Sequence, residues 1–267
     1  MATTVIQTDL APGYIDTLHS EWLKMRSLRL YPVVLAAIVI VSVAVGAFMS
    51  VIGGHNIAEA QAESEYSVIF YSSALTTWAF AGIAANYVGI EFTGVGQATF
   101  TATASRSRVL AAKFVLIAVA GTVVGTVSSV MTAAVTQGVL ASRGFESLDL
   151  TDPRLIRAIL ILVAASMAVQ GLIAAGFAVL SRSAVWGLVV AGLLSLLPVS
   201  FAPLLGTWYS EHIPRWLPGA AVESLAGVAA PEGYGYLPTP LALMAVAAWL
   251  VVVLGAAILW LRSLDIR

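Results

Sequence analysis

The stretch Glu91–Lys113, EFTGVGQATFTATASRSRVLAAK, separates two strongly apolar runs of the sequence. Its distinctive side chains are two phenylalanines and three cations: Phe92, Phe100, Arg106, Arg108 and Lys113. Clustered Arg and Lys beside an apolar run favour the cytoplasmic side of a membrane, because the insertion machinery retains positive flanks there. The stretch therefore predicts a short cytoplasmic bridge between two membrane-spanning helices.

The composition indicates a polytopic membrane protein. Of the 267 residues, 60% are hydrophobic and 10% are charged, whereas soluble domains carry roughly 25% charged residues. Cysteine is absent, which excludes disulfides, thiolate catalysis and cysteine-based metal sites.

Residues 1–30 are predicted to form a cytoplasmic lead and an amphipathic helix. From Tyr14 onward, apolar residues recur at steps of three and four: Ile15, Leu18, Trp22, Met25 and Leu28. Polar residues fill the other positions: Asp16, His19, Glu21, Lys24, Arg26 and Arg29. This pattern is typical of a helix lying in the membrane interface, with Trp22, Lys24 and Arg26 in contact with lipid.

Residues 31–267 are predicted to form one all-α integral membrane domain. A helix needs about 20 mainly apolar residues to cross the hydrocarbon layer, and six stretches qualify. These spans cover residues 31–52, 66–90, 109–140, 155–180, 184–205 and 238–261. The third is longer than a bilayer requires, so we expect it to tilt or protrude.

Three local signals refine this division. Gly121 and Gly125 form a small-xxx-small pair, which allows close contact between helices. Asp152 followed by a proline predicts the N-cap and first turn of the fourth span. Pro198 and Pro203 are expected to kink or break the fifth span near its end.

The basic residues orient these spans. With both termini inside the cell, the cytoplasmic segments hold nine of the 13 Lys and Arg residues: Lys24, Arg26, Arg29, Arg106, Arg108, Lys113, Arg182, Arg262 and Arg267. The outer segments hold the other four: Arg143, Arg154, Arg157 and Arg215. This bias is the expected one, so we predict six spans, both termini cytoplasmic, and a multi-pass protein of a bacterial plasma membrane.

The second span is rich in polar side chains: Ser72, Ser73, Thr76, Thr77 and Asn86. They can hydrogen-bond within their own helix or across to a neighbouring helix, as structural contacts. They can also line a translocation path for an amphipathic substrate. The sequence leaves both interpretations open and slightly favours the structural one.

The chain lacks the residues that would make it an enzyme or a self-powered pump. No predicted span carries an ionisable residue near its middle, where ion-coupled pumps usually need one. Neither a phosphate-binding loop nor a His-Glu-x-x-His metalloprotease motif occurs. We therefore expect no catalytic residue, metal or cofactor in this chain, and any energy must come from a partner.

Three segments together resemble the membrane subunit of bacterial ATP-binding cassette transporters, in the type-2 exporter permease family. HSEWLKMRS, residues 19–27, is similar to the family's amphipathic opening helix. Glu91-Phe92-x-Gly94 with SRSRVLAAK, residues 105–113, is similar to its acidic turn and basic re-entry. WLPGA, residues 216–220, is similar to the outer segment before the last span. Thr93 departs from the family, which often has a basic residue there.

The resemblance implies a coupling bridge over residues 91–108 and an outer loop with short re-entrant helices over residues 206–237. It also implies docking of two copies of an ATPase subunit, which hold ATP and Mg, and a second permease copy that makes a homodimer. The residues expected at the ATPase are Glu91, Phe92, Gly94, Phe100, Arg106 and Arg108. Membrane lipids are the other partner, and no nucleic acid is expected.

Two other functional classes remain open at this point. The chain could be a non-transporting membrane scaffold or an immunity protein that sequesters a toxic peptide. It could also be a secondary transporter, although it lacks midplane charges and evident inverted repeats. The leading interpretation is an exporter permease for a hydrophobic or amphipathic substrate.

Overall fold

The computed structural model describes residues 13–57, 66–93, 106–145, 148–195, 201 and 204–264, and in these ranges the chain is helical with no strand. The first half contains α1 (Tyr14–Ser27), α2 (Leu30–Ile52), η1 (Ser67–Phe70), α4 (Ser73–Gly89), η2 (Ile90–Phe92) and α6 (Arg106–Ser142). The second half contains α7 (Pro153–Arg157), η3 (Ala158–Ala165), α8 (Ser166–Ser181), α9 (Ala184–Ser195), α11 (Thr207–His212), η5 (Pro214–Trp216), α12 (Pro218–Ala226) and α13 (Thr239–Leu264).

Four helices are long and apolar enough to cross a membrane, which indicates a transmembrane protein. They are Leu30–Ile52, Arg106–Ser142, Pro153–Ser181 and Thr239–Ser263. The third of these helices is α7, η3 and α8 in continuous succession. Their bounds lie within a few residues of the first, third, fourth and sixth predicted spans.

The other two predicted spans have shorter helices in the described ranges. The second contains η1 and α4, and η2 begins at its last residue. The helix α4 has 17 residues, or about 25 Å at 1.5 Å per residue. The fifth contains α9, which has 12 residues. Pro198 and Pro203, expected to break the fifth span, lie outside the described residues.

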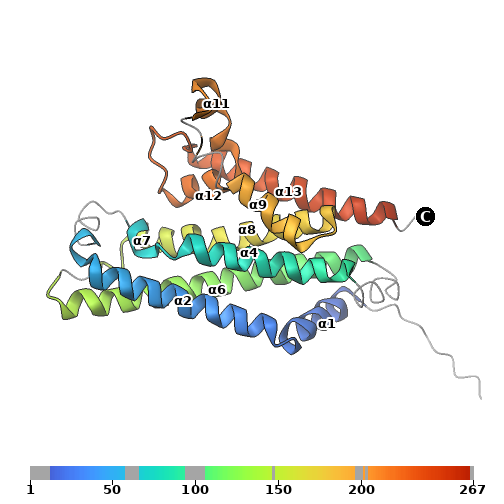
Figure 1. Ribbon diagram of the computed structural model, residues 1–267, viewed down its shortest axis with the longest axis horizontal. Helices are drawn as coiled ribbons and strands as arrows, with labels where there is room; N and C mark the ends of the chain where they lie inside the picture. Colours follow the sequence, from blue (N-terminus) through green and yellow to red (C-terminus); the bar gives the residue numbers. More distant parts are fainter. Residues whose placement is uncertain are drawn as a thin grey trace, which may run out of the picture.

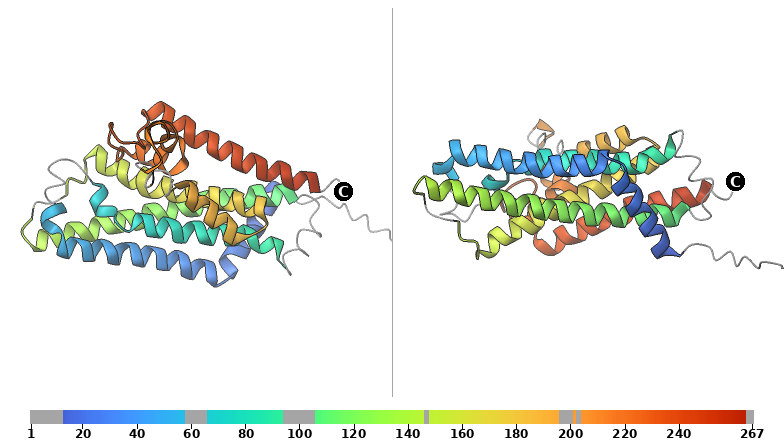
Figure 2. Two further views of the ribbon diagram at one scale, coloured as in Figure 1. Left: turned by 45° about the horizontal axis from the view of Figure 1, so that its top comes forward. Right: turned by 90° about the horizontal axis from the view of Figure 1, so that it is seen from below.

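The helices run alternately between two ends of an elongated bundle (Figures 1 and 2). We call one the α1 end: it contains α1, η2, the start of α6 and the end of α13. The opposite end, near α7, we call the α7 end. The segments α11 and α12 lie in the half of the bundle near the α7 end (Figure 1).

The helix α4 lies inside the bundle, where it packs against α2, α8 and α9. Its buried side chains include Phe80 at 2% exposure and Val88 at 0%. Gly89 allows α9 to approach closely, because a Cβ there would lie 2.9 Å from the Ala184 nitrogen. Small and apolar side chains at these positions thus allow the neighbouring helices to pack tightly around α4.

Two local predictions are confirmed. A Cβ on Gly121 would lie 2.8 Å from the Ala168 Cα, and one on Gly125 would lie 2.6 Å from the Ala164 Cα. These two glycines therefore do permit close contact between α6 and the η3–α8 helix. The Asp152 Oδ1 accepts a hydrogen bond from the Arg154 backbone N–H at 2.8 Å, which is the expected N-cap.

Candidate functional site

The α1 end of the bundle contains a buried cluster of charges from three elements. Glu21 lies on α1, Glu91 on η2 and Lys113 on α6. The Lys113 Nζ lies 2.7 Å from the Glu21 Oε2 and 2.9 Å from the Glu91 Oε1. The three side chains are at most 7% exposed. One ammonium group therefore joins two carboxylates, and we call this set the Lys113 cluster.

Tyr87 and Lys24 complete the surroundings of the Lys113 cluster. The Tyr87 hydroxyl donates to the Glu21 backbone oxygen at 3.1 Å and to its Oε2 at 3.3 Å. The Tyr87 ring lies 3.9 Å from the Lys113 Nζ, in cation–π geometry. The Lys24 Nζ lies 2.5 Å from the other carboxylate oxygen of Glu21. Two ammonium groups thus balance two carboxylates.

This balance keeps Glu21 ionised. Burial by itself would raise the pKa of the Glu21 carboxyl. The nearby Lys113 and Lys24 ammonium groups outweigh burial, and they hold the pKa below its ordinary value of 4.5. Glu21 is consequently a carboxylate at neutral pH, fixed between the two lysines.

The structure corrects the expected orientation of α1. Glu21 was expected on the polar face, yet it is 1% exposed and faces the bundle together with Met25. The two residues are four apart and so share one face of the helix. Ile15 and Trp22, by contrast, are 79% and 45% exposed. The lysine partners compensate for burial of the carboxylate, while the apolar residues Ile15 and Trp22 remain exposed.

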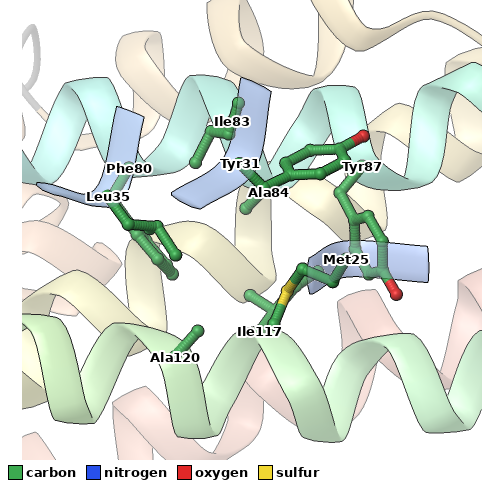
Figure 3. A pocket seen from close by; sticks show the side chains of 9 residues that line it. All are labelled: Met25, Tyr31, Leu35, Phe80, Ile83, Ala84, Tyr87, Ile117 and Ala120. Carbon is green, nitrogen blue, oxygen red and sulfur yellow. The ribbon is translucent and has the colours of Figure 1, made fainter. Parts of the chain in front are cut away.

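A compact apolar layer separates the Lys113 cluster from the middle of the bundle. The Tyr31 and Tyr87 rings meet edge to face, with centroids 5.2 Å apart. Figure 3 shows these rings beside Met25, Phe80 and Ile117, around a cavity of about 20 Å³. A buried water needs roughly 10–15 Å³ and several polar partners. This apolar space therefore forms no aqueous route from the cluster into the bundle.

The structure places the predicted ATPase-coupling residues unequally. Glu91 is 5% exposed, with its carboxylate on Lys113. Phe92 is partly buried and packs against the apolar core. Arg106 and Arg108 are half-buried in the first turn of α6. The remaining two, Gly94 and Phe100, lie outside the described residues.

Sequence reasoning missed the central role of Lys113. The residue was assigned to the basic flank of a span, but its side chain is 1% exposed. The sequence does contain an indication that Lys113 is unusual, because it is the only charged residue between Val109 and Leu140. A single cation at the edge of so long an apolar run needs a buried partner. The sequence alone did not indicate that this partner is on the amphipathic helix.

The polar residues predicted on the second span fall into two main groups. Ser72 and Thr76 are buried, and the Ser72 and Ser42 hydroxyls lie 2.9 Å apart, which links α4 to α2. Asn86 is separate and accepts a hydrogen bond from the Tyr31 hydroxyl at 3.5 Å. Ser73 and Thr77, by contrast, line a cavity. Ser72 and Thr76 therefore make structural contacts, whereas Ser73 and Thr77 border a cavity.

The predicted interfacial contacts lie on the outer face of α1. Trp22 is 45% exposed, the Lys24 side chain is 40% exposed, and Arg26 is exposed. Trp22 and Arg26 also line an apolar groove of about 220 Å³ against α2 and α6. These two residues are accessible from outside the bundle, while Lys24 contacts Glu21.

The described residues contain no group of three or more His, Asp and Glu side chains that could hold a metal ion. The Lys113 cluster consists of charges that pair with one another. It joins three segments that are distant in the sequence. Comparison with known proteins finds no matching family model, no matching curated protein and no matching solved structure.

Proposed function

We propose that the chain is the permease subunit of an ATP-binding cassette exporter in a bacterial plasma membrane. In this proposal six helices span the membrane, both termini are cytoplasmic, and the α1 end faces the cytoplasm. Two copies form the translocation path for an amphipathic or hydrophobic substrate. A separate ATPase subunit, also in two copies, binds ATP and Mg and docks at residues 91–108.

The observation that carries the proposal is the position of the Lys113 cluster. Glu91 lies at the start of residues 91–108, and Lys113 lies five residues beyond their end. The Lys113 ammonium contacts the Glu91 carboxylate and also the Glu21 carboxylate on α1. A force applied to residues 91–108 would therefore act on α1, α4 and α6 together, as coupling to a partner requires.

The physics of the cluster supports transmission by rigid movement. Separating Lys113 from its two carboxylates inside the protein would leave uncompensated buried charges, which is strongly unfavourable. When residues 91–108 are displaced, a common shift of α1, α4 and α6 therefore costs less free energy than separation of these helices from one another. Such rigid-body shifts are an established way to transmit the energy of a partner.

The experiment that tests the proposal is co-purification after expression with the genes that neighbour this one, followed by subunit identification and an ATPase assay. We expect a cassette ATPase in equal number to the permease, with activity that responds to substrate. Arg108→Glu should remove the ATPase from the complex. Arg262→Glu is the matched control, because Arg262 is an exposed arginine in the last turn of α13, outside residues 91–108.

A second variant separates docking from coupling. Lys113→Met disturbs the buried cluster and leaves the residues of the bridge unchanged. We expect the folded fraction of this variant to retain the ATPase subunit but to lose transport and substrate-dependent ATP hydrolysis. A stable complex without any ATPase, or full biological activity of the permease alone, would reject the exporter in favour of a scaffold. Proton-dependent uptake without an ATPase would indicate a secondary transporter.

A further inference from the structure

A second cavity lies between α4, η3, α8, α9 and α12, in the half of the bundle near the α7 end. Its volume is about 100 Å³. Its polar lining residues are Ser73, Thr77, Ser166, Gln170, Ser195 and Glu223. Leu162 and the Trp78 ring add an apolar side. This mixed lining differs from the wholly apolar cavity beside the Lys113 cluster.

Glu223 is the one ionisable residue in the lining of this cavity. Within the described parts of the chain, its carboxylate makes no hydrogen bond or ion pair. The protein around Glu223 partly desolvates the carboxyl and raises its pKa above the ordinary value of 4.5, although the residue is exposed at the surface of the chain. Glu223 also keeps an exposed surface, so a ligand can reach this carboxylate, which has no cation beside it among the described residues.

The walls of the cavity are held in place without Glu223. Ser195 donates a hydrogen bond to the Gln170 Oε1 at 2.8 Å, which joins α9 to α8. Arg157 donates from its Nε to the Leu225 backbone oxygen at 2.6 Å, which joins α7 to α12. The Ser224 hydroxyl donates to the Gly235 oxygen at 3.0 Å. The cavity is therefore formed in advance, as is usual for ligand sites.

The π-helical segment η3 borders the same cavity. Residues Ala158–Ala165 form this segment, and its Leu162 and the following Ser166 both contribute to the lining. π-Helical turns widen a helix and occur frequently at functional sites. The π-helical segment is therefore a second indication, independent of Glu223, that this cavity is a functional site.

The size of the cavity limits what can enter it. Pockets for drug-sized molecules are roughly 300–1,000 Å³, so about 100 Å³ accommodates one end group of a longer molecule. The negative charge of the Glu223 carboxylate favours a cation, and the face of the Trp78 ring can attract an alkylated ammonium group. A single carboxylate with hydroxyl and amide groups is a poor site for a bare metal ion, which needs more charged or carbonyl ligands.

We infer that this cavity binds the ammonium end group of an amphipathic organic cation, with Glu223 as the counter-ion and Trp78 against the alkyl substituents. The apolar tail of the ligand would lie outside the cavity, along the bundle. A protonated Glu223 releases its proton when the cation binds, so the charge inside the cavity stays balanced. Binding itself requires only this chain; identification of the ligand as cargo rests on the proposed exporter function.

Direct binding tests this site without the ATPase. The full chain in maltoside micelles is dialysed to equilibrium against radiolabelled dodecyltrimethylammonium, with empty micelles subtracted. We expect saturable binding at pH 7.5 that is weakened at least tenfold in Glu223→Gln. Glu232→Gln should bind as the wild type does, because Glu232 belongs to the same connection before α13 but does not line the cavity. Radiolabelled dodecyl sulfate should show no saturable binding.

Two further readouts distinguish a binding role from a structural one. The affinity of the wild type should fall as the pH is lowered and Glu223 becomes protonated, whereas the residual affinity of Glu223→Gln should not change. Trp78→Phe should weaken binding but retain the pH dependence. Equal affinities in the wild type and in folded Glu223→Gln would overturn the inference, as would equal binding of the sulfate.

The ammonium group can belong to a free amphiphile or to a lipid headgroup. Addition of phosphatidylethanolamine to the micelles separates these sources. Competition with the probe in the wild type would assign the site to a lipid amine, and undiminished probe binding would assign it to a free amphiphile. Loss of ATPase co-purification with binding intact would reject the exporter proposal and leave this site standing.

Discussion

The Lys113 ammonium lies 2.7 Å from the Glu21 carboxylate, and both side chains are 1% exposed. Neither charge could be buried in this way without the other. The pair therefore fixes the position of α1 on the bundle more specifically than an apolar contact would. Because Glu91 shares the same ammonium at 2.9 Å, the position of η2 depends on the same contact.

Removal of the shared cation should strongly destabilise the protein. Lys113→Met leaves two carboxylates at the α1 end without their common partner, and loss of one member of a buried ion pair costs about 3–5 kcal/mol. Unfolding in mixed micelles, by titration with dodecyl sulfate, measures the change. Arg262→Met is the control, since Arg262 is exposed and should change the free energy of unfolding by less than about 0.5 kcal/mol. Equal effects of the two substitutions would contradict a buried cluster.

The low pKa of Glu21 predicts loss of stability in acid. A carboxyl group whose pKa is lower in the folded state stabilises the protein above the pKa of the unfolded state, and this contribution is lost as the pH falls through the folded value. For Glu21 the loss begins below about 4.5. The melting temperature should therefore fall more steeply between pH 5 and pH 3.5 in the wild type than in Glu21→Gln. Identical slopes would show that the lysines do not lower this pKa.

Most of the helical architecture could be predicted from the sequence. Long apolar runs and their polar ends predicted α2, α6, the α7–α8 helix and α13 to within a few residues. Hydrophobic length is a strong signal because the hydrocarbon layer has a fixed thickness. The amphipathic helix was also predicted from Tyr14, where α1 begins.

The contacts of the Lys113 cluster could not be predicted from the sequence in the same way. Glu21, Glu91 and Lys113 are far apart in the sequence, and each has an ordinary role where it stands: a polar face, a loop and a basic flank. Periodicity predicts which residues of α1 share a face. It does not predict that the face with Glu21 turns inward, because that depends on the ion pairs of Glu21 with Lys24 and Lys113. Likewise, nothing local distinguishes Ser72, in a buried hydrogen bond, from Ser73 at the cavity.

The contact at Gly125 predicts a steric effect. A Cβ at this position would lie 2.6 Å from the Ala164 Cα, a backbone atom that cannot move aside alone. Gly125→Ala should therefore force α6 away from η3 and destabilise the protein by about 1–3 kcal/mol, as overpacking does.

Gly138 provides the matched control for Gly125 in the same helix. A Cβ on Gly138 would meet nothing within 4 Å. Gly138→Ala should be neutral or stabilise the protein by up to about 1 kcal/mol, because alanine favours the helix. The same dodecyl sulfate titration compares the two variants, and an equal response at both positions would exclude a specific contact at Gly125.

Glu223 should affect stability with the opposite pH dependence to Glu21. Partial desolvation by the surrounding protein raises the pKa of Glu223 in the folded state, so the folded state binds a proton more tightly than the unfolded state does. Stability is then lost as the pH rises above the unfolded value of about 4.5. Glu223→Gln removes this effect and should raise the melting temperature at pH 7.5, with the difference from the wild type disappearing near pH 4. At one fixed concentration, dodecyltrimethylammonium should raise the melting temperature of the wild type more than that of Glu223→Gln, because the variant lacks the carboxylate and binds the cation more weakly. A Glu223→Gln variant that melts below the wild type at pH 7.5 would mean that the carboxylate already has a stabilising partner and that the cavity is electrostatically complete.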